Sequence, residues 1–404
     1  MQLYNNVDPK DTYDSLLGYV RETSDDETLS AKRFLQESEG QFGELPLITS
    51  AKQDYIYEAI KPFFNTKLLL AECQAQPTYF QQCYPQSLIQ NCQKIGEGLY
   101  GEVFLFKNPS GGTTVMKIIP IEGDQRINGE NQKKLNEVLS ELIIATELSH
   151  LRTNPINQTS AFIEVQSIKC VQGCYPEELL DLWDLFKETR GSINDSPEIF
   201  KEDQLYAVLE TSYGGCDMES FAFENASQAF SMCLQIAYAM AVAEEELQFE
   251  HRDLHWGNIL LTRVPSDDFV TFKLQGREIR IESFGVKVQI IDFTMSRITS
   301  HGVDIYTDLS KDCGIFTGSG DYQFEIYQLM QKRNRNEWSH YEPYSNILWL
   351  SYILDKTITA LHYKNSCCKQ HKKYMNKLKC LNLEILGYDT TKEFVLNLVN
   401  NKFL

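Results

Sequence analysis

The order of secondary-structure signals along the chain constrains its fold more than any other feature. Short apolar runs around glycine-rich turns are typical of strands, and they come first. Apolar residues at helical spacing dominate later, above all after residue 300. We predict strands at 92–95, 103–107, 113–119 and 204–210, and helices at 133–149 and 226–249. A glycine pair, Gly214 and Gly215, lies between the two parts and interrupts regular structure. This order predicts an α+β fold with two lobes, a small β-rich N-terminal lobe and a larger helical C-terminal lobe.

Charge and composition divide the chain further and exclude some classes of protein. The 404 residues are 42% hydrophobic and 23% charged, which is normal for a globular chain. The net charge is −18, so we expect no direct DNA binding, because that needs a basic surface. The longest apolar run, 347–354, is far shorter than the roughly 20 residues that cross a bilayer, so we expect no membrane association. We predict an acidic, partly flexible leader at 1–80, an N-terminal lobe with an insertion at 81–211, and a C-terminal lobe at 212–404.

The cysteines favour a reducing compartment. There are 11 of them, an odd number scattered along the chain, and the first residues, MQLYNNVDPK, lack the apolar core of a secretory signal. We therefore expect reduced, mostly buried thiols in a nuclear or cytosolic protein. A cluster of Cys367, Cys368, His371 and Cys380 fits no common zinc spacing. The lysines around it allow a nucleic-acid patch, but a solvated helix face is the commoner cause of such a run.

A glycine-rich segment follows the first predicted strand. It reads G-x-G-x-x-G-x-V, and its residues are Ile95, Gly96, Glu97, Gly98, Leu99, Tyr100, Gly101, Glu102 and Val103. A hairpin of this composition brings backbone N–H groups close to phosphates without obstruction by side chains. A dinucleotide-binding turn would need a helix directly afterwards, whereas Val-Phe-Leu-Phe predicts a strand. A plain turn between two strands remains the alternative.

One lysine, Lys117, stands in the apolar strand Thr-Val-Met-Lys-Ile-Ile. A buried ammonium group is costly unless a counter-charge or an anionic ligand accompanies it. Glu141, in the predicted helix that follows, is a suitable partner. The alternative is a lysine at the edge of the sheet that extends its amine to solvent.

The segment His-Arg-Asp-Leu-His-Trp-Gly-Asn at 251–258 carries the strongest chemical signal. Asp253 and Asn258 are separated by five positions on a predicted loop, which suits a base that accepts a hydroxyl proton and an amide that ligates a divalent cation. Asp292 ends a second apolar strand and could provide another metal contact. Each acid could instead cap a turn or a strand end, but the elements occur together and in this order.

The chain resembles the eukaryotic protein kinases and, within them, the haspin family. The resemblance covers about residues 92–360 and rests on KIGEGLYGEVF, KIIPIEG, CVQGCYP, FEHRDLHWGNILL, IIDFTMSRI, FTGSGDYQFEIYQLM and YSNILWL. HWGN combined with Asp-Phe-Thr, in place of the more common Asp-Phe-Gly, is highly specific, as is the absence of Ala-Pro-Glu. Ser319 departs from the family, which has a second acid there.

The resemblance implies a role for each site residue. Lys117 would orient the phosphates of ATP and pair with Glu141, Asp253 would be the catalytic base, and Asn258 and Asp292 would hold Mg²⁺. The glycine-rich segment would cover the phosphates. The remaining nucleotide contacts would come from Ser212, Tyr213, Asp217 and His255, and a basic peptide would be held by Asp217, Glu219, His255 and Asp321.

The resemblance also implies an activity, a partner and a location. The chain would transfer the γ-phosphate of ATP to a threonine near the start of the histone H3 tail, at the third residue, and would need no obligatory phosphorylation of its activation segment. It would act as a monomer in the nucleus, on chromosomes, and also in the cytoplasm. Two alternatives stay open: a small-molecule kinase of the aminoglycoside or choline type, whose loop also carries Asp-Leu-His and Asn, and a non-catalytic pseudokinase.

Overall fold

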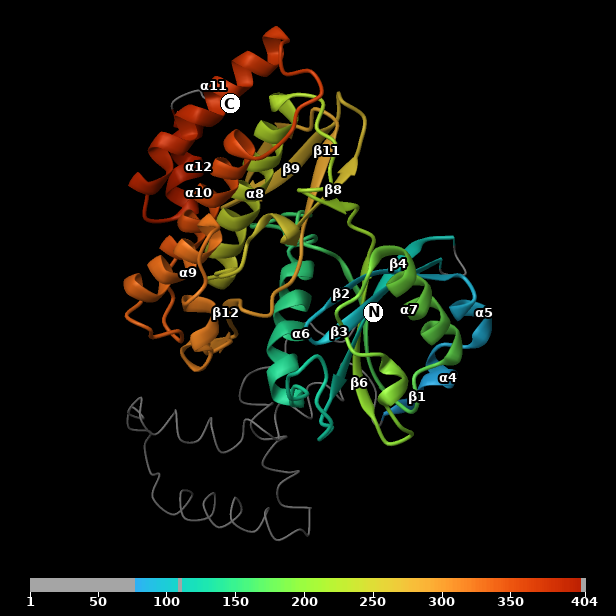
Figure 1. Cartoon of the computed structure of the whole chain (residues 1–404). Helices are drawn as coiled ribbons and strands as arrows, with labels where there is room; N and C mark the ends of the chain where they lie inside the picture. Colours follow the sequence, from blue (N-terminus) through green and yellow to red (C-terminus); the bar gives the residue numbers. More distant parts are fainter. Residues whose placement is uncertain (1–76, 108–110, 401–404) are drawn as a thin grey trace, which may run out of the picture. The chain divides into compact units, whose positions relative to one another are not determined.

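A computed structural model describes residues 77–107 and 111–400 (Figure 1). The predicted acidic leader lies almost entirely outside these residues. The first half of the described chain is built around one sheet. Its elements are β1 (Thr78–Tyr79), α4 (Phe80–Cys83), α5 (Gln86–Ile89), β2 (Cys92–Gly98), β3 (Gly101–Lys107), β4 (Thr113–Ile121), α6 (Leu135–His150), β5 (Val165–Gln172), α7 (Glu177–Arg190), η1 (Pro197–Ile199) and β6 (Leu205–Ser212).

The N-terminal lobe is a six-stranded sheet in the order β1-β5-β6-β4-β3-β2. Neighbouring strands are antiparallel except for β1 and β5. Alternation along β4 separates its side chains onto two faces. Met116 and Ile118 join a core with Leu179 of α7, whereas Ile119 and Ile121 join a core with α6. Lys117 therefore shares the α6 face with Ile119 and Ile121.

The C-terminal lobe is mainly helical. Its elements are β7 (Cys216–Asp217), α8 (Ala226–Leu247), η2 (Trp256–Asn258), β8 (Ile259–Arg263), β9 (Phe269–Leu274), β10 (Arg277–Glu282), β11 (Val286–Ile290), β12 (Arg297–Ser300), β13 (Val303–Tyr306), η3 (Leu309–Lys311), η4 (Cys313–Phe316), α9 (Tyr322–Arg333), α10 (Tyr344–Thr359), α11 (Lys369–Glu384), η5 (Ile385–Gly387) and α12 (Thr391–Asn400). The strands form the sheet β11-β8-β7 and the hairpins β9–β10 and β12–β13.

Helix α8 is the centre of this lobe, with α10, α11 and α12 around it (Figure 1). Among the described residues it is the one helix that is long and apolar enough to cross a membrane. Its apolar stretch is fully buried inside the protein, so packing within the lobe accounts for its composition. The Asn225 side chain caps the helix by accepting from the Ser227 N–H, as expected of an N-cap asparagine.

The predicted α+β fold is confirmed, and each predicted strand and helix has a counterpart within a few residues. Among the elements that the predictions missed are β5, α7 and the β9–β10 and β12–β13 hairpins. The expectation of mostly buried thiols is wrong for the described cysteines. Of these, Cys170 and Cys233 are buried, while Cys174, Cys216, Cys367 and Cys380 are exposed.

Candidate active site

Lys117 on β4 and Glu141 on α6 form the ion pair that the sequence predicted. Nζ of Lys117 lies 2.6 Å from Oε1 of Glu141. The hydroxyl of Thr294 lies 3.0 Å from the other carboxylate oxygen of Glu141 and 2.7 Å from Oδ1 of Asp292. Its single proton can be donated to only one of these oxygens at a time. The hydroxyl therefore connects the lysine–glutamate pair of the N-terminal lobe with the aspartate that follows β11.

Electrostatics keep Lys117 and Asp292 charged. Burial acts against the charged form of Lys117, but the carboxylates of Asp292 and Glu141 outweigh it and raise the pKa of the lysine. Burial likewise opposes ionisation of Asp292, but Lys117 and hydrogen bonds from Thr294 hold the pKa of its carboxyl group far below the usual range. The arrangement offers an ammonium group and a carboxylate side by side, which suits the phosphates and the cation of a nucleotide.

Asp253 lies in the loop before β8, and the hydroxyl of Tyr327 on α9 donates to its Oδ1 at 2.5 Å. The imidazole Nε2 of His255 lies 4.0 Å from Oδ2. Burial, opposed by the hydrogen bond from Tyr327 and aided by the charge of Asp292, raises the pKa of Asp253 to about 8. Sequence reasoning did not find Tyr327, because nothing local marks a tyrosine 74 positions away as a partner of this acid.

Asn258 joins the Asp253 loop to the end of β11 through one side-chain and one backbone hydrogen bond. Nδ2 of Asn258 donates to the carbonyl of Asp253 at 2.9 Å, and the N–H of Ile291 donates to the carbonyl of Asn258 at 3.0 Å. Asp292 has a φ of 61°, a left-handed conformation that is uncommon for residues other than glycine. Such a strained conformation persists where the surrounding structure determines the backbone. Here the conformation of Asp292 directs its side chain toward Thr294.

The glycine-rich segment is a hairpin between β2 and β3, as the sequence predicted, and a strand follows it as expected. Ile95, Gly96, Glu97 and Gly98 lie on β2; Leu99 and Tyr100 form the turn; and Gly101, Glu102 and Val103 lie on β3. A Cβ atom at Gly101 would lie 2.4 Å from the carbonyl oxygen of Ile118, so only glycine fits at that position.

The segment between the lobes runs from the end of β6 to β7. Ser212 ends β6, Tyr213 is exposed, and Asp217 lies on β7. Gly215 has a φ of +98°, and a Cβ there would lie 2.0 Å from the carbonyl oxygen of Leu261. The predicted glycine interruption is therefore a close approach of two backbones. Both carboxylate oxygens of Asp217 accept from Ser220, one from its N–H and one from its hydroxyl.

Two of the acids expected to hold a peptide, Glu219 and Asp321, lie near Tyr352 together with Asp253. The charges of Asp321, Glu219 and Asp253 all act on Tyr352, whose pKa is raised first by burial and then by these carboxylates. Glu219 is exposed. Asp321 already has internal partners, because it caps α9 and forms an ion pair with Lys356 at 2.5 Å.

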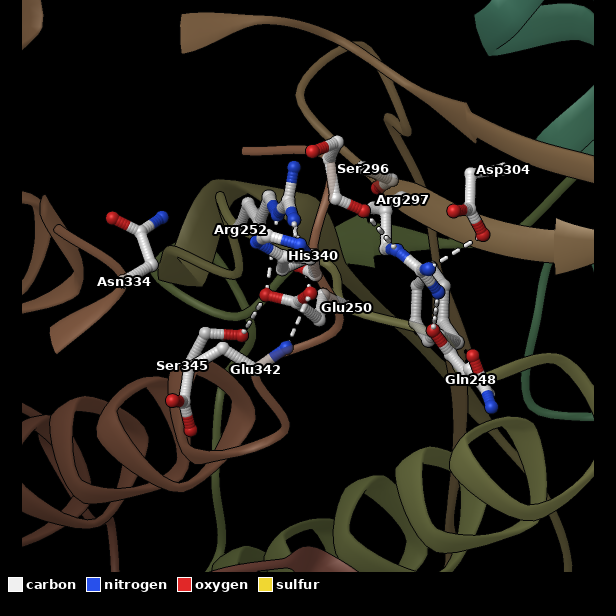
Figure 2. A network of polar contacts seen from close by, with 12 residues as sticks. Gln248, Glu250, Arg252, Ser296, Arg297, Asp304, Asn334, His340, Glu342 and Ser345 are labelled. Atoms are coloured by element: carbon white, nitrogen blue, oxygen red, sulfur yellow. Dashed lines mark hydrogen bonds and ion pairs between the residues drawn. The ribbon is translucent and has the colours of Figure 1, made fainter. Parts of the chain in front are cut away.

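Arg252, next to Asp253, is fully buried. Its guanidinium group donates to both carboxylate oxygens of Glu250, at 2.9 and 3.2 Å (Figure 2). Glu250 also accepts from the N–H of Glu342 and the hydroxyl of Ser345, both at 2.9 Å. Arg297 lies nearby and pairs with Asp304 at 2.6 Å. The charge of Arg252 is therefore compensated inside the protein.

The cysteine cluster near the C-terminus has structural roles instead. Sγ of Cys368 accepts from the N–H of His371, and Nδ1 of His371 accepts from the N–H of Ala226. Within 77–107 and 111–400, no group of three or more His, Cys, Asp or Glu residues could hold a metal ion. Magnesium does not need such a group, since one or two protein ligands and the phosphates of a nucleotide complete its shell.

The two-lobed fold, the lysine–glutamate pair and the Asp253 and Asp292 loops define a protein-kinase-like domain. The family model described as "Haspin like kinase domain" matches residues 29–393. The chain belongs to the haspin-like kinase family. The match begins inside the segment assigned above to the leader.

Curated relatives agree with this assignment. The chain is 41% identical over 339 residues to the serine/threonine-protein kinase haspin of Mus musculus, covering 83% of this chain and 45% of the relative. It is 40% identical over 334 residues to the haspin homolog of Drosophila melanogaster, covering 81% and 59%. Against the haspin homolog of Arabidopsis thaliana it is 39% identical over 337 residues, covering 81% and 54%. The chain thus spans about half the length of the curated relatives it matches. Membership of a kinase family implies the use of ATP.

Proposed function

We propose that the protein is a serine/threonine protein kinase that uses ATP. The observation that carries this proposal is the connected set Lys117–Glu141–Thr294–Asp292, with Asp253 on the adjoining loop. Lys117 supplies a fixed ammonium group for the phosphates. Asp253 accepts the proton of the substrate hydroxyl as that oxygen attacks phosphorus. Tyr327 and the side-chain amide of Asn258 hold the Asp253 loop in place.

The residues present also suit magnesium. Asn258 uses its Nδ2 in the hydrogen bond to Asp253, which leaves its amide oxygen as a ligand, and the pKa of Asp292 is low enough to keep it a carboxylate. Amide and carboxylate oxygens are ligands that Mg²⁺ prefers. When bound, the cation would neutralise charge on the phosphates. The chain's own contribution is to fix these two side chains, Asn258 through Asp253 and Asp292 through Thr294.

The proposed substrate is a threonine in a basic peptide, the start of the histone H3 tail. Acids around the site favour a cationic peptide, and Glu219 is the exposed member of that group. Asp217 and Asp321 already accept from Ser220 and Lys356, so a peptide would share or displace those partners. Action on this substrate would place the protein in the nucleus, on chromosomes, with a further cytoplasmic pool. We further propose that it is monomeric and binds neither DNA nor membranes directly.

Independence from activation-segment phosphorylation is part of the proposal. Many kinases use the arginine before the catalytic aspartate to bind a phosphorylated residue, which orders the segment. Here Glu250 already neutralises Arg252, which is 0% exposed. A phosphate group would have to displace a buried carboxylate to reach it.

The test is transfer of radiolabelled phosphate from ATP to a histone H3 tail peptide and to the same peptide with its third residue changed from threonine to alanine. The proposal predicts labelling of the first peptide only. Equal labelling of both would overturn the substrate assignment. Transfer to choline or an aminoglycoside with no peptide labelling would favour the small-molecule alternative, and no transfer to any acceptor would favour a pseudokinase. Asp253→Asn should abolish transfer while ATP binding persists, because it removes the proton acceptor but not the nucleotide contacts.

A further inference from the structure

The glycine-rich hairpin is held from outside by two segments that sequence reasoning assigned no role. One is 191–196, which follows α7, and the other is 126–131, which precedes α6. We propose that these segments act as a strap that positions the hairpin for the phosphates of the nucleotide. This inference rests on the proposed use of ATP. The positioning residues are Asn194, Ser192 and Asn128.

Asn194 makes the central contacts of the strap. Its Nδ2 donates to the carbonyl of Gly98 at 3.1 Å and to Oε1 of Glu102 at 3.0 Å. Gly98 ends β2, and Glu102 lies at the start of β3. One side-chain amide therefore joins both arms of the hairpin next to its turn. It binds a backbone carbonyl in the segment proposed to cover the phosphates, so it restrains the backbone directly.

Ser192 and a buried lysine hold Glu97 and Glu102, the pair of residues that lies opposite each other just behind the turn of the hairpin. The hydroxyl of Ser192 donates to Oε2 of Glu97 at 2.7 Å. The ammonium group of Lys94, fully buried, lies 2.6 Å from Oε2 of Glu97 and 2.9 Å from Oε2 of Glu102. It also lies 3.7 Å from the centre of the Phe186 ring on α7. A buried cation between two carboxylates is held strongly, because moving either acid leaves it uncompensated.

Asn128 holds the tip of the hairpin from the other side. Its Nδ2 donates to the carbonyl of Leu99 at 2.8 Å. Asn128 and Asp195 also bond reciprocally: the N–H of Asn128 donates to the Asp195 carboxylate at 2.7 Å, and the N–H of Asp195 donates to the Asn128 side chain at 2.6 Å. The two segments, 67 positions apart at this contact, therefore brace each other as well as the hairpin.

These contacts predict a hairpin that is ordered before a nucleotide binds. A loop that must be ordered on binding loses conformational freedom at that moment, which weakens affinity. The strap makes that ordering part of folding. The gain in affinity would concern the phosphates, because they are the part of the nucleotide that the hairpin is proposed to cover. Adenine and ribose would depend on Ser212, Tyr213 and Asp217 instead.

The first test measures amide hydrogen exchange in the nucleotide-free protein. Asn194→Ala removes the central contacts, and Asn128→Gly removes the tip contact while keeping a residue that tolerates the φ of 52° found there. We expect exchange at Gly98–Gly101 to become about tenfold faster in either variant. Ser196→Ala is the control: its side chain caps η1 and has no contact with the hairpin. Unchanged exchange in both strap variants would overturn the proposal.

The second test compares the affinities of a non-hydrolysable ATP analogue and of adenosine. In Asn194→Ala we expect the analogue to bind about tenfold more weakly and adenosine to bind within twofold of the wild type. An equal loss for both ligands would indicate general damage to the lobe and would overturn the positioning role. If the wild type binds neither ligand, the proposed function and the role of the strap in nucleotide binding both fail. Faster amide exchange in the strap variants would still show that the strap orders the hairpin.

Discussion

The buried pair of Glu250 and Arg252 allows a quantitative test of how the catalytic loop is held. Glu250 is 1% exposed and Arg252 is 0% exposed. We consider Glu250→Gln, which keeps the shape of the side chain and removes its charge. The guanidinium group then loses its charged partner and keeps neutral ones: the amide oxygen of the glutamine, the carbonyl of His340 at 3.4 Å and the Trp338 ring, whose centre lies 5.3 Å away.

The burial of both side chains determines how much stability the substitution removes. Removing one partner of a buried pair costs about 3–5 kcal/mol, because the other charge stays buried without compensation. A domain is stable by roughly 5–15 kcal/mol, so Glu250→Gln should still fold. Arg252→Met should cost less, since Glu250 keeps the hydrogen bonds from Glu342 and Ser345. The double variant leaves no buried charge at the pair and should be more stable than the sum of the single effects predicts.

The assay is urea denaturation of the wild type, both single variants and the double variant, analysed as a double-mutant cycle. We expect a coupling energy of about 2–3 kcal/mol. The control is the exposed pair Glu224 and Lys364, at 2.8 Å, examined as Glu224→Gln and Lys364→Met. Its coupling should stay below about 1 kcal/mol, because solvent screens it. Equal coupling at the buried and exposed pairs would refute the argument that Glu250 compensates Arg252.

Three further changes test separate parts of the structure. Tyr327→Phe removes the hydroxyl that holds Asp253 and should lower kcat by roughly 10-fold or more while leaving KM for ATP unchanged; a change in KM alone would contradict this. Burial raises the pKa of Glu244 from 4.5 to about 7, so the folded protein holds a proton that the unfolded chain releases, and wild-type stability should fall by on the order of 3 kcal/mol between pH 4.5 and 7. Glu244→Gln should not lose stability in this way as the pH rises. If the free energies of unfolding of the two proteins change with pH in parallel, Glu244 is not the group that holds the proton. Gly215→Ala should destabilise more than Gly276→Ala, because both have positive φ but only the first Cβ meets a backbone carbonyl; equal unfolding free energies would show that the contact relaxes.

Local patterns predicted those parts of the fold and the site that depend on local physics. Strand alternation and helical spacing located β4 and α6, and a lone lysine between apolar neighbours required a counter-charge, which Glu141 provides. The glycine hairpin was predictable for the same reason, since Gly101 lies against the carbonyl of Ile118 on the adjacent strand.

Contacts between distant segments could not be predicted in this way. Tyr327 and Asp253 are 74 positions apart, and the strap joins Asn128 to Asp195 across 67 positions. Asn and Ser residues in loops follow no periodic pattern. They are common in turns whatever their role, so their presence in a sequence does not indicate a contact with a distant segment. Their role depends on which backbone carbonyl the folded chain brings within reach.

Three cations show how far a sequence signal extends: the side chains of Lys94 and Arg252 are fully buried, and that of Lys117 is 26% exposed. Lys94, Lys117 and Arg252 each lie beside a carboxylate that the folded chain supplies. Each holds one part of the candidate site: the hairpin, the link between sheet and helix, and the loop that carries Asp253. A cation in apolar surroundings is therefore informative in the sequence, because its burial demands a partner. The net charge of −18 says less about substrate, since acids such as Glu250 and Glu102 are used internally, and only acids left exposed, such as Glu219, remain free for a basic peptide.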